Sequence, residues 1–282
     1  MSHQRLNVVT SFFLVRHVPG ALSLAARPLG GPAAPAAFAD MDPLARARQD
    51  EYVECIAANL ACRHVGSVGL LVQDAPSLAA LRAHVLPRLP PAARGRLVPM
   101  LHRAAPAQPT YGDLFRLAGQ LFHGQPVMVA NADIYVTDAG FQWPALAAEF
   151  FPDAKRPAAG ASPSDAADSA GAPVALALTR TEDENTLFAP LIDDYRGSHD
   201  AFVFRAPMAP AVVAACDHPQ NCYKAENIVV HELRRAGYRL ANPCRRARVF
   251  HRHATDVRQW LPSAAGEEGS PAERYGRVEP EA

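Results

Sequence analysis

The segment Pro126-Val-Met-Val-Ala-Asn-Ala-Asp-Ile-Tyr-Val136 contains an apolar run that stops at Asn131 and Asp133 before hydrophobic residues resume. A nearly continuous apolar run is typical of a strand buried inside an open α/β sheet. Ligands of such sheets bind beyond the carboxyl ends of the strands. The pattern therefore predicts a central strand that carries Asp133 to a functional site.

A second strand-like run, Arg248-Val-Phe-His-Arg-His253, carries two histidines two residues apart. If this segment is extended, the imidazoles of His251 and His253 lie on one face. Carboxylate oxygens and imidazole nitrogens both bind divalent cations, so we expect Asp133 and one of the two histidines to hold one ion, Mn²⁺ or Mg²⁺. The alternative is that Asp133 caps a turn and both histidines lie on the surface.

Strand and helix patterns alternate along the chain. Strands are predicted at residues 6–14, 65–72, 97–101, 126–136, 174–178, 201–204 and 248–253, and helices near 48–60, 77–85, 110–122 and 225–236. Repeated strand-then-helix units favour a mostly parallel sheet flanked by helices. The predicted fold class is therefore α/β and Rossmann-like, in a single catalytic domain over residues 1–261.

Three segments lack hydrophobic periodicity. Residues 19–45 and 153–173 are rich in Ala, Pro, Gly and Ser and are predicted to be low-complexity insertions. Residues 262–282 are predicted to form a disordered polar tail.

Composition excludes several classes of function. The 28 basic and 28 acidic residues balance, so nucleic acid is not an expected partner. The N-terminus lacks the pattern of a signal peptide, and no run of about 20 apolar residues occurs, so we expect a cytoplasmic protein without a membrane span. The five cysteines lack Cys-x-x-Cys spacing and are predicted to be buried thiols, with a Cys216–Cys222 bridge as the alternative.

The order of several short motifs resembles that of nucleotide-sugar glycosyltransferases with the GT-A fold, in particular an uncharacterised bacterial and algal group. The motifs are Val8-Val-Thr-Ser-Phe-Phe13, Arg48-Gln-Asp-Glu51, Pro109-Thr-Tyr-Gly-Asp113, Asn131-x-Asp133, Ala177-Leu-Thr-Arg180, Ser198-His-Asp200-Ala-Phe-Val-Phe204, Ala225-Glu-Asn227, Asn242-Pro-Cys and His251-x-His253. The resemblance covers most of residues 6–260 outside the two insertions. One departure is that Asn131 stands where the family's Asp-x-Asp motif has its first carboxylate.

The resemblance implies transfer of a sugar from a nucleotide-diphosphate donor to a glycan or another hydroxyl acceptor. Asp133 with His251 or His253 would bind the cation, and Asp200 and Glu226 would be the catalytic carboxylates, Asp200 as the base. The donor would be bound by Thr10, Arg48, Glu51, Asn131, Arg180 and Arg258. Simpler alternatives are a turn cap for Asp200, a helix cap for Glu226 and a surface ion pair for Arg48 with Glu51.

Two other functions remain open from the sequence. The neutral Asn131 suits a metal-independent enzyme, or a non-catalytic GT-A scaffold that binds a glycan or a partner protein. Asp133 with His-x-His also suits a metal-dependent phosphoesterase or nucleotidyltransferase, although such enzymes need more clustered carboxylates. Walker and Gly-x-Gly-x-x-Gly motifs are missing from the sequence, which counts against kinases, ATPases and dehydrogenases.

Overall fold

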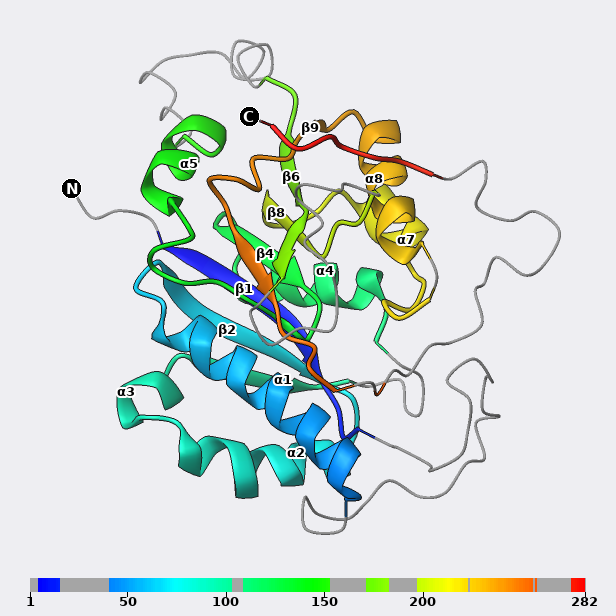
Figure 1. The fold of residues 1–282 in the computed structure, drawn as a ribbon. Helices are drawn as coiled ribbons and strands as arrows, with labels where there is room; N and C mark the ends of the chain where they lie inside the picture. Colours follow the sequence, from blue (N-terminus) through cyan, green and yellow to red (C-terminus); the bar gives the residue numbers. More distant parts are fainter. Residues whose placement is uncertain are drawn as a thin grey trace, which may run out of the picture.

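The computed structural model of the protein describes residues 5–15, 41–102, 109–152, 171–182, 197–222, 224–255, 257 and 275–281. Their centre is a seven-stranded sheet with helices on both faces (Figure 1). In spatial order the strands are β3 (Leu97–Leu101), β2 (Val65–Val72), β1 (Leu6–Phe12), β4 (Pro126–Ala130), β8 (Ala201–Arg205), β6 (Val174–Leu178) and β9 (Arg239–Ala241).

The sheet is mostly parallel. Strands β3, β2, β1 and β4 are all parallel, β8 runs antiparallel to both of its neighbours, and β6 and β9 are again parallel. The central strands β1 and β4 are buried at every position, as their apolar sequences predict. The predicted α/β class with a mostly parallel central sheet is confirmed.

Two hydrophobic cores lie on opposite faces of this sheet. Successive side chains of β1 point to opposite faces of the sheet. Val8 packs in the core that includes α1 (Pro43–Ala61), α2 (Ala75–Ala80) and α5 (Trp143–Phe150). Val9 packs in the other core, with α4 (Tyr111–Leu121), α7 (Pro210–Ala215) and α8 (Ala225–Arg235). The chain passes from α2 to β3 through η2 (Leu81–Val85), η3 (Leu86–Arg88) and α3 (Pro91–Arg94).

A second, three-stranded sheet lies beyond the end of β4 and was not predicted. Its strands, in order, are β5 (Ile134–Tyr135), β10 (Val249–His251) and β7 (Arg180–Glu182). Strand β10 pairs antiparallel with β5, which sets His251 opposite Ile134, and parallel with β7, which sets His251 opposite Glu182. The predicted strand 126–136 is two strands, β4 and β5, and β10 lies within the predicted strand 248–253, whereas β7 was not predicted. The pairing of such short strands depends on tertiary contacts that no sequence pattern shows.

Several predicted boundaries are wrong. Helix α1 begins at Pro43, inside the predicted insertion 19–45, because Asp42 accepts hydrogen bonds from the amides of Leu44 and Ala45 and caps the helix. Asp74, not Ser77, caps α2. Helices α5 and α7 were missed, and His253 lies just after β10 instead of within it.

The predicted disordered tail is also partly wrong. Residues 275–281 pack on the body of the protein, with Val278 only 8 % exposed. Residues 16–40 and 153–170, which make up most of the two predicted insertions, lie outside the described residues. All five cysteines are buried, and none forms a disulfide in the described part of the chain. Within that part, no helix combines the length and hydrophobicity needed to cross a bilayer.

We predict that Asn59→Ala destabilises the protein by about 2 kcal/mol, because it leaves two buried backbone groups unpaired. Asn59 is 1 % exposed. Its side-chain Nδ2 donates to the carbonyl of Ile134 (3.0 Å), and its Oδ1 accepts from the backbone amide of Val136 (3.0 Å). It thereby ties α1 to β5, directly after Asp133. Urea unfolding measures the loss. Leu44→Ala, at a 52 % exposed site on the same helix, is the control and should change the free energy of unfolding by less than about 0.5 kcal/mol; equal losses would contradict the prediction.

Candidate functional site

A cavity of about 370 Å³ opens at the carboxyl ends of β1 and β4. Strands β1, β2 and β3 follow one another outward on one side of the sheet, whereas β4 lies on the other side of β1. The direction in which strands are added therefore reverses between β1 and β4. Open α/β sheets bind their ligands at this reversal. Ser11, at the end of β1, and Asn131, directly after β4, both line the cavity.

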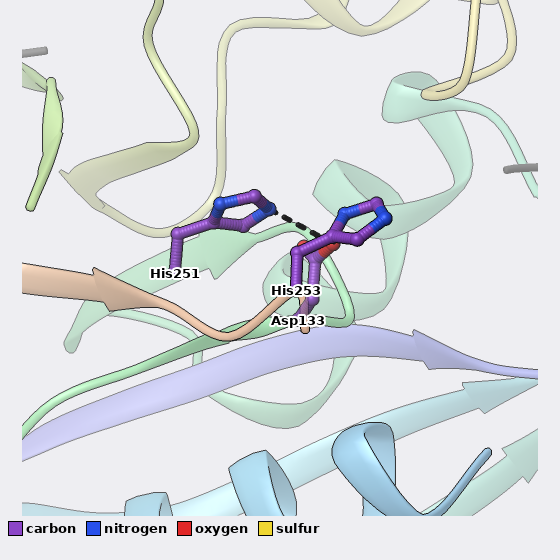
Figure 2. A group of neighbouring side chains, drawn as sticks. All are labelled: Asp133, His251 and His253. Atoms are coloured by element: carbon purple, nitrogen blue, oxygen red, sulfur yellow. Dashed lines mark hydrogen bonds and ion pairs between the residues drawn. The ribbon is translucent and has the colours of Figure 1, made fainter. Parts of the chain in front are cut away.

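Asp133, His251 and His253 converge in this cavity (Figure 2). The Oδ2 atom of Asp133 lies 3.2 Å from His251 Nε2 and 3.8 Å from His253 Nδ1. Among the described residues they form the one group of three potential metal ligands, with one ligand atom from each residue within 4.8 Å of the others. The pairing of β10 with β5 explains the convergence, because it also lets the amide of Arg252 donate to the carbonyl of Asp133 (2.9 Å).

Arg48 reaches Asp133 from helix α1. Its guanidinium donates to Asp133 Oδ2 (2.5 Å), Glu51 Oε2 (2.5 Å) and the carbonyl of Arg252 (3.0 Å), and it lies 4.6 Å from the ring centre of Tyr52. Burial alone would lower the pKa of Arg48, but the neighbouring Tyr52, Asp133 and Glu51 outweigh it and raise that pKa. Arg48 is therefore a permanent cation of the site.

Glu51 holds Arg48 in place. Besides the Arg48 ion pair, its carboxylate accepts from the amides of Ala254 (3.1 Å) and Thr255 (2.9 Å), and its side chain is only 8 % exposed. The alternative of a surface Arg48–Glu51 pair is wrong. Glu51 does not line the cavity, so its predicted direct contact with a donor is not supported; it positions Arg48 instead.

His251 lies between two carboxylates. Its Nδ1 is 2.8 Å from Glu182 Oε2, on the side opposite Asp133. Burial favours the neutral ring, but the pairing with Asp133 and Glu182 raises the pKa of His251 to about 9. The pKa of Asp133 lies well below its ordinary value, because His251, Arg48 and His253 overcome the effect of burial. At neutral pH the pair is an imidazolium and a carboxylate.

The three side chains fit a divalent cation. Glu182 fixes His251 through Nδ1 and leaves Nε2 directed at Asp133, which is the arrangement that orients metal-binding histidines in proteins. A cation would replace the proton on Nε2, so binding would release a proton. Two imidazoles and one carboxylate suit Mn²⁺ or another transition-metal ion better than Mg²⁺, which favours oxygen ligands.

Asn131 connects the carboxylates on the other side of the cavity. Its Oδ1 accepts from the hydroxyl of Tyr111 (3.1 Å) and from Gln220 Nε2 (3.2 Å). Its Nδ2 donates to Asp200 Oδ1 (3.3 Å) and Glu226 Oε1 (3.4 Å). The side-chain amide can both accept and donate in this way, whereas an ionised aspartate accepts only. The neutral residue in this motif therefore has a structural reason.

Asp200 and Glu226 differ in environment. Asp200 Oδ1 also accepts from Arg180 (3.1 Å), and its Oδ2 accepts from Ser198 Oγ (2.9 Å), so both oxygens are engaged. Glu226 lines the cavity at the start of α8, where burial and, secondly, the charge of Asp200 raise its pKa to about 8. The contact with Ser198 joins two side chains, so it does not decide for or against the turn-cap alternative for Asp200.

Arg180 joins the two halves of the site. Its guanidinium pairs with Glu182 (2.5 Å) on the histidine side and with Asp200 (3.1 Å) on the carboxylate side, and its side chain is 17 % exposed to the cavity. Arg180 is the first residue of β7 and lies two residues after the end of β6.

One predicted donor-binding residue, Thr10, is not brought into the cavity. Thr10 is 3 % exposed inside β1 and does not line it, whereas its neighbour Ser11 does. Arg258 lies outside the described residues. Tyr111 and Phe115 pack in the hydrophobic core beside α4, and the Tyr111 hydroxyl also reaches Asn131.

The residues of the site that were missed from the sequence include Glu182, Gln220 and Tyr275. Glu182 and Gln220 lie in short polar segments, where nothing in the spacing distinguishes them from surface residues. Tyr275 is an aromatic residue in a polar tail, which was the one available indication that this tail contacts the body of the protein.

Comparisons with known proteins add no assignment: no family model matches the chain, and no curated protein matches it.

We predict that His251 stabilises the metal-free protein at low pH and that this contribution disappears at high pH. Its folded pKa of about 9 exceeds the ordinary 6.5, so the contribution is complete below pH 6.5 and is lost as the pH rises through 9. The advantage of the wild type over His251→Asn should be on the order of 3 kcal/mol at pH 6 and approach zero near pH 10. Urea unfolding in EDTA measures it; His123→Asn, at an exposed turn, should follow the wild type. A difference that does not change with pH would refute the prediction.

We also predict that Asn131→Asp destabilises the protein more than Asn131→Ala at pH 8, by roughly 2 kcal/mol. Both variants lose the donated hydrogen bonds, but the aspartate adds a negative charge beside Asp200 and Glu226. Such repulsion raises the pKa of the new carboxyl group. The loss of stability is therefore present at pH values above the ordinary pKa of aspartate and disappears as the pH falls and the group is protonated. Unfolding at pH 8 and pH 4.5 tests this; an aspartate variant as stable as the alanine variant at pH 8 would contradict it.

Proposed function

We propose that this protein is a glycosyltransferase that moves a sugar from a nucleotide-diphosphate donor to a hydroxyl acceptor, with a divalent cation, preferably Mn²⁺, held by Asp133, His251 and His253. The observation that carries the proposal is the convergence of these three side chains in a cavity at the winding reversal of an open α/β sheet. A bound cation would neutralise the diphosphate leaving group. The same convergence is compatible with the motif order that resembles the GT-A family.

The cavity has room and chemistry for a donor. Phe13 and Gln73, which follow β1 and β2, line the cavity, and the nucleoside of a donor would lie beside them at the carboxyl ends of the strands. The diphosphate would then reach Asp133 and its histidines. Arg180, at the boundary with the carboxylates, would donate to phosphate oxygens, because a guanidinium matches their geometry.

Glu226 is the better proton acceptor of the two predicted carboxylates. Asp200 has both oxygens engaged by Arg180, Asn131 and Ser198, so it would hold Arg180 in position. Glu226 lines the cavity with a pKa near 8, close to that of an efficient general base at neutral pH. As the acceptor oxygen bonds to the anomeric carbon, the bond to the diphosphate breaks, the hydroxyl proton passes to Glu226 and the nucleoside diphosphate leaves.

One observation favours the second candidate, a non-catalytic scaffold that binds a nucleotide or glycan. Asp133 Oδ2 is already paired with Arg48 and His251, so the site is electrically satisfied without a cation. The two candidates separate in a nucleotide-sugar screen: a scaffold would bind donors without hydrolysis or transfer, whereas the enzyme would release nucleoside diphosphate at least slowly into water.

The test is calorimetric titration of the purified protein with UDP, GDP, CDP, dTDP and ADP, each with and without Mn²⁺. We expect at least one to bind in the presence of Mn²⁺, and Asp133→Asn to weaken that binding at least about tenfold by removing a cation ligand. Asp50→Asn is the matched control, because Asp50 pairs only with Arg46 and Arg88 at the surface in the described structure. Absence of Mn²⁺-dependent binding for every nucleotide would refute the proposed function.

A further inference from the structure

The C-terminal segment 275–281 is fixed to helix α8 and to the loop before β10. The amide of Gly276 donates to the carbonyl of Asn227 (3.0 Å), and Asn227 Nδ2 donates back to the carbonyl of Gly276 (3.0 Å). Asn242 Nδ2 donates to the carbonyl of Val278 (2.8 Å), and the amide of Glu281 donates to the carbonyl of Asn242 (2.9 Å). Figure 1 shows this segment in red beside α8. It is an integral part of the fold.

Gly276 allows the close approach of this segment to α8. A Cβ atom at this position would lie 2.6 Å from Val230 Cγ1 and 2.7 Å from the amide nitrogen of His231. The second of these atoms belongs to the helix backbone, which cannot move aside easily. Any larger residue would therefore push the segment away from α8, and with it the neighbouring Tyr275.

Tyr275 brings an aromatic ring to the wall of the cavity. Its hydroxyl accepts from Arg277 Nε (2.9 Å), and the Lys224 ammonium and the Arg277 guanidinium each lie 5.1 Å from its ring centre. A Cβ atom on Gly197 would lie 2.8 Å from the Tyr275 hydroxyl, so this loop also approaches closely. The ring is half-buried and is held by contacts on more than one side.

The position of Tyr275 follows from the order of groups in the cavity. Phe13 and Gln73 lie at the ends of β1 and β2, and Asp133 follows β4. Glu226 and Asn227 begin α8, and Tyr275 is attached to this helix through Gly276. A donor that places its nucleoside at β1 and its diphosphate at Asp133 directs its sugar toward Glu226. Tyr275 lines the same cavity, and the Gly276–Asn227 hydrogen bond joins its segment to the start of α8, so an acceptor beside Glu226 would lie on the Tyr275 side.

We propose that Tyr275 forms an acceptor subsite for a carbohydrate, whose ring lies against the tyrosine ring while one hydroxyl faces Glu226. The inference rests on the proposed function and names its acceptor class. The half-buried Tyr275 ring lines the same cavity as Ser198, Lys224 and Glu226, so aromatic carbon lies in one wall with polar groups. A pyranose presents the same combination, with C–H groups on its face and hydroxyls on its rim. Tyr275 is thus a binding residue that the C-terminal segment supplies.

The test is saturation-transfer NMR on the full chain with Mn²⁺ and the nucleotide that binds best by calorimetry. The probes are the methyl glycosides of glucose, galactose, mannose and N-acetylglucosamine. We expect at least one glycoside to bind the wild type, and its affinity to fall about three- to tenfold in Tyr275→Ala through loss of the aromatic contact. Tyr275→Phe, which keeps the ring, should retain the affinity. Gly276→Ala should reproduce the loss without removing a cavity side chain.

Gly95→Ala is the control for Gly276→Ala, because a Cβ atom at Gly95 meets no atom within 4 Å. Nucleotide affinity should be unchanged in all four variants. Nucleotide binding without any glycoside signal, or a glycoside affinity that Tyr275→Ala leaves unchanged, would overturn this inference alone. Failure of every nucleotide to bind would remove the proposed function and this inference together.

Discussion

The structure of the site depends on the ion pairs of Asp133. This carboxylate, with a side chain 14 % exposed, lies within 4 Å of Arg48, His251 and His253, which come from helix α1 and from the β10 region. An unpaired charge at such a depth would be costly, and removing one partner of a buried pair is strongly destabilising. The pairs therefore fix α1, the end of β4 and β10 relative to one another and keep Asp133 ionised.

Asn131 divides the cavity into two regions of different chemistry. On one side, Asp133 has a lowered pKa beside three basic side chains; on the other, Glu226 has a pKa near 8 beside Asp200. Environments that push the pKa values of nearby carboxyl groups apart are typical of sites that need both a charged ligand and a proton acceptor. A carboxylate at position 131 would join the negative charges of the two regions, which explains why an amide is found between them.

The strands and helices with long apolar or amphipathic patterns could be predicted from the sequence. Strands β1, β2, β3, β4 and β6 and helices α4 and α8 were placed correctly or nearly so, because buried strands and amphipathic helices have distinctive patterns. The convergence of Asp133 with His251 was predicted from residue type and strand position. The three-stranded sheet was not, because β5, β7 and β10 contain only two or three residues each, and their register depends on tertiary pairing. The polar composition of residues 262–282 concealed Gly276 and Tyr275, whose role depends on contact with α8.

The most direct measurement is X-ray diffraction from crystals grown with Mn²⁺, recorded where manganese scatters anomalously. We expect an anomalous peak within coordination distance of Asp133 and of at least one of His251 and His253, with His251 still bonded to Glu182 through Nδ1. If no manganese is found there and Asp133 is still paired with Arg48 and His251, the three side chains are not a metal site. The same conclusion holds if the ion is bound only elsewhere.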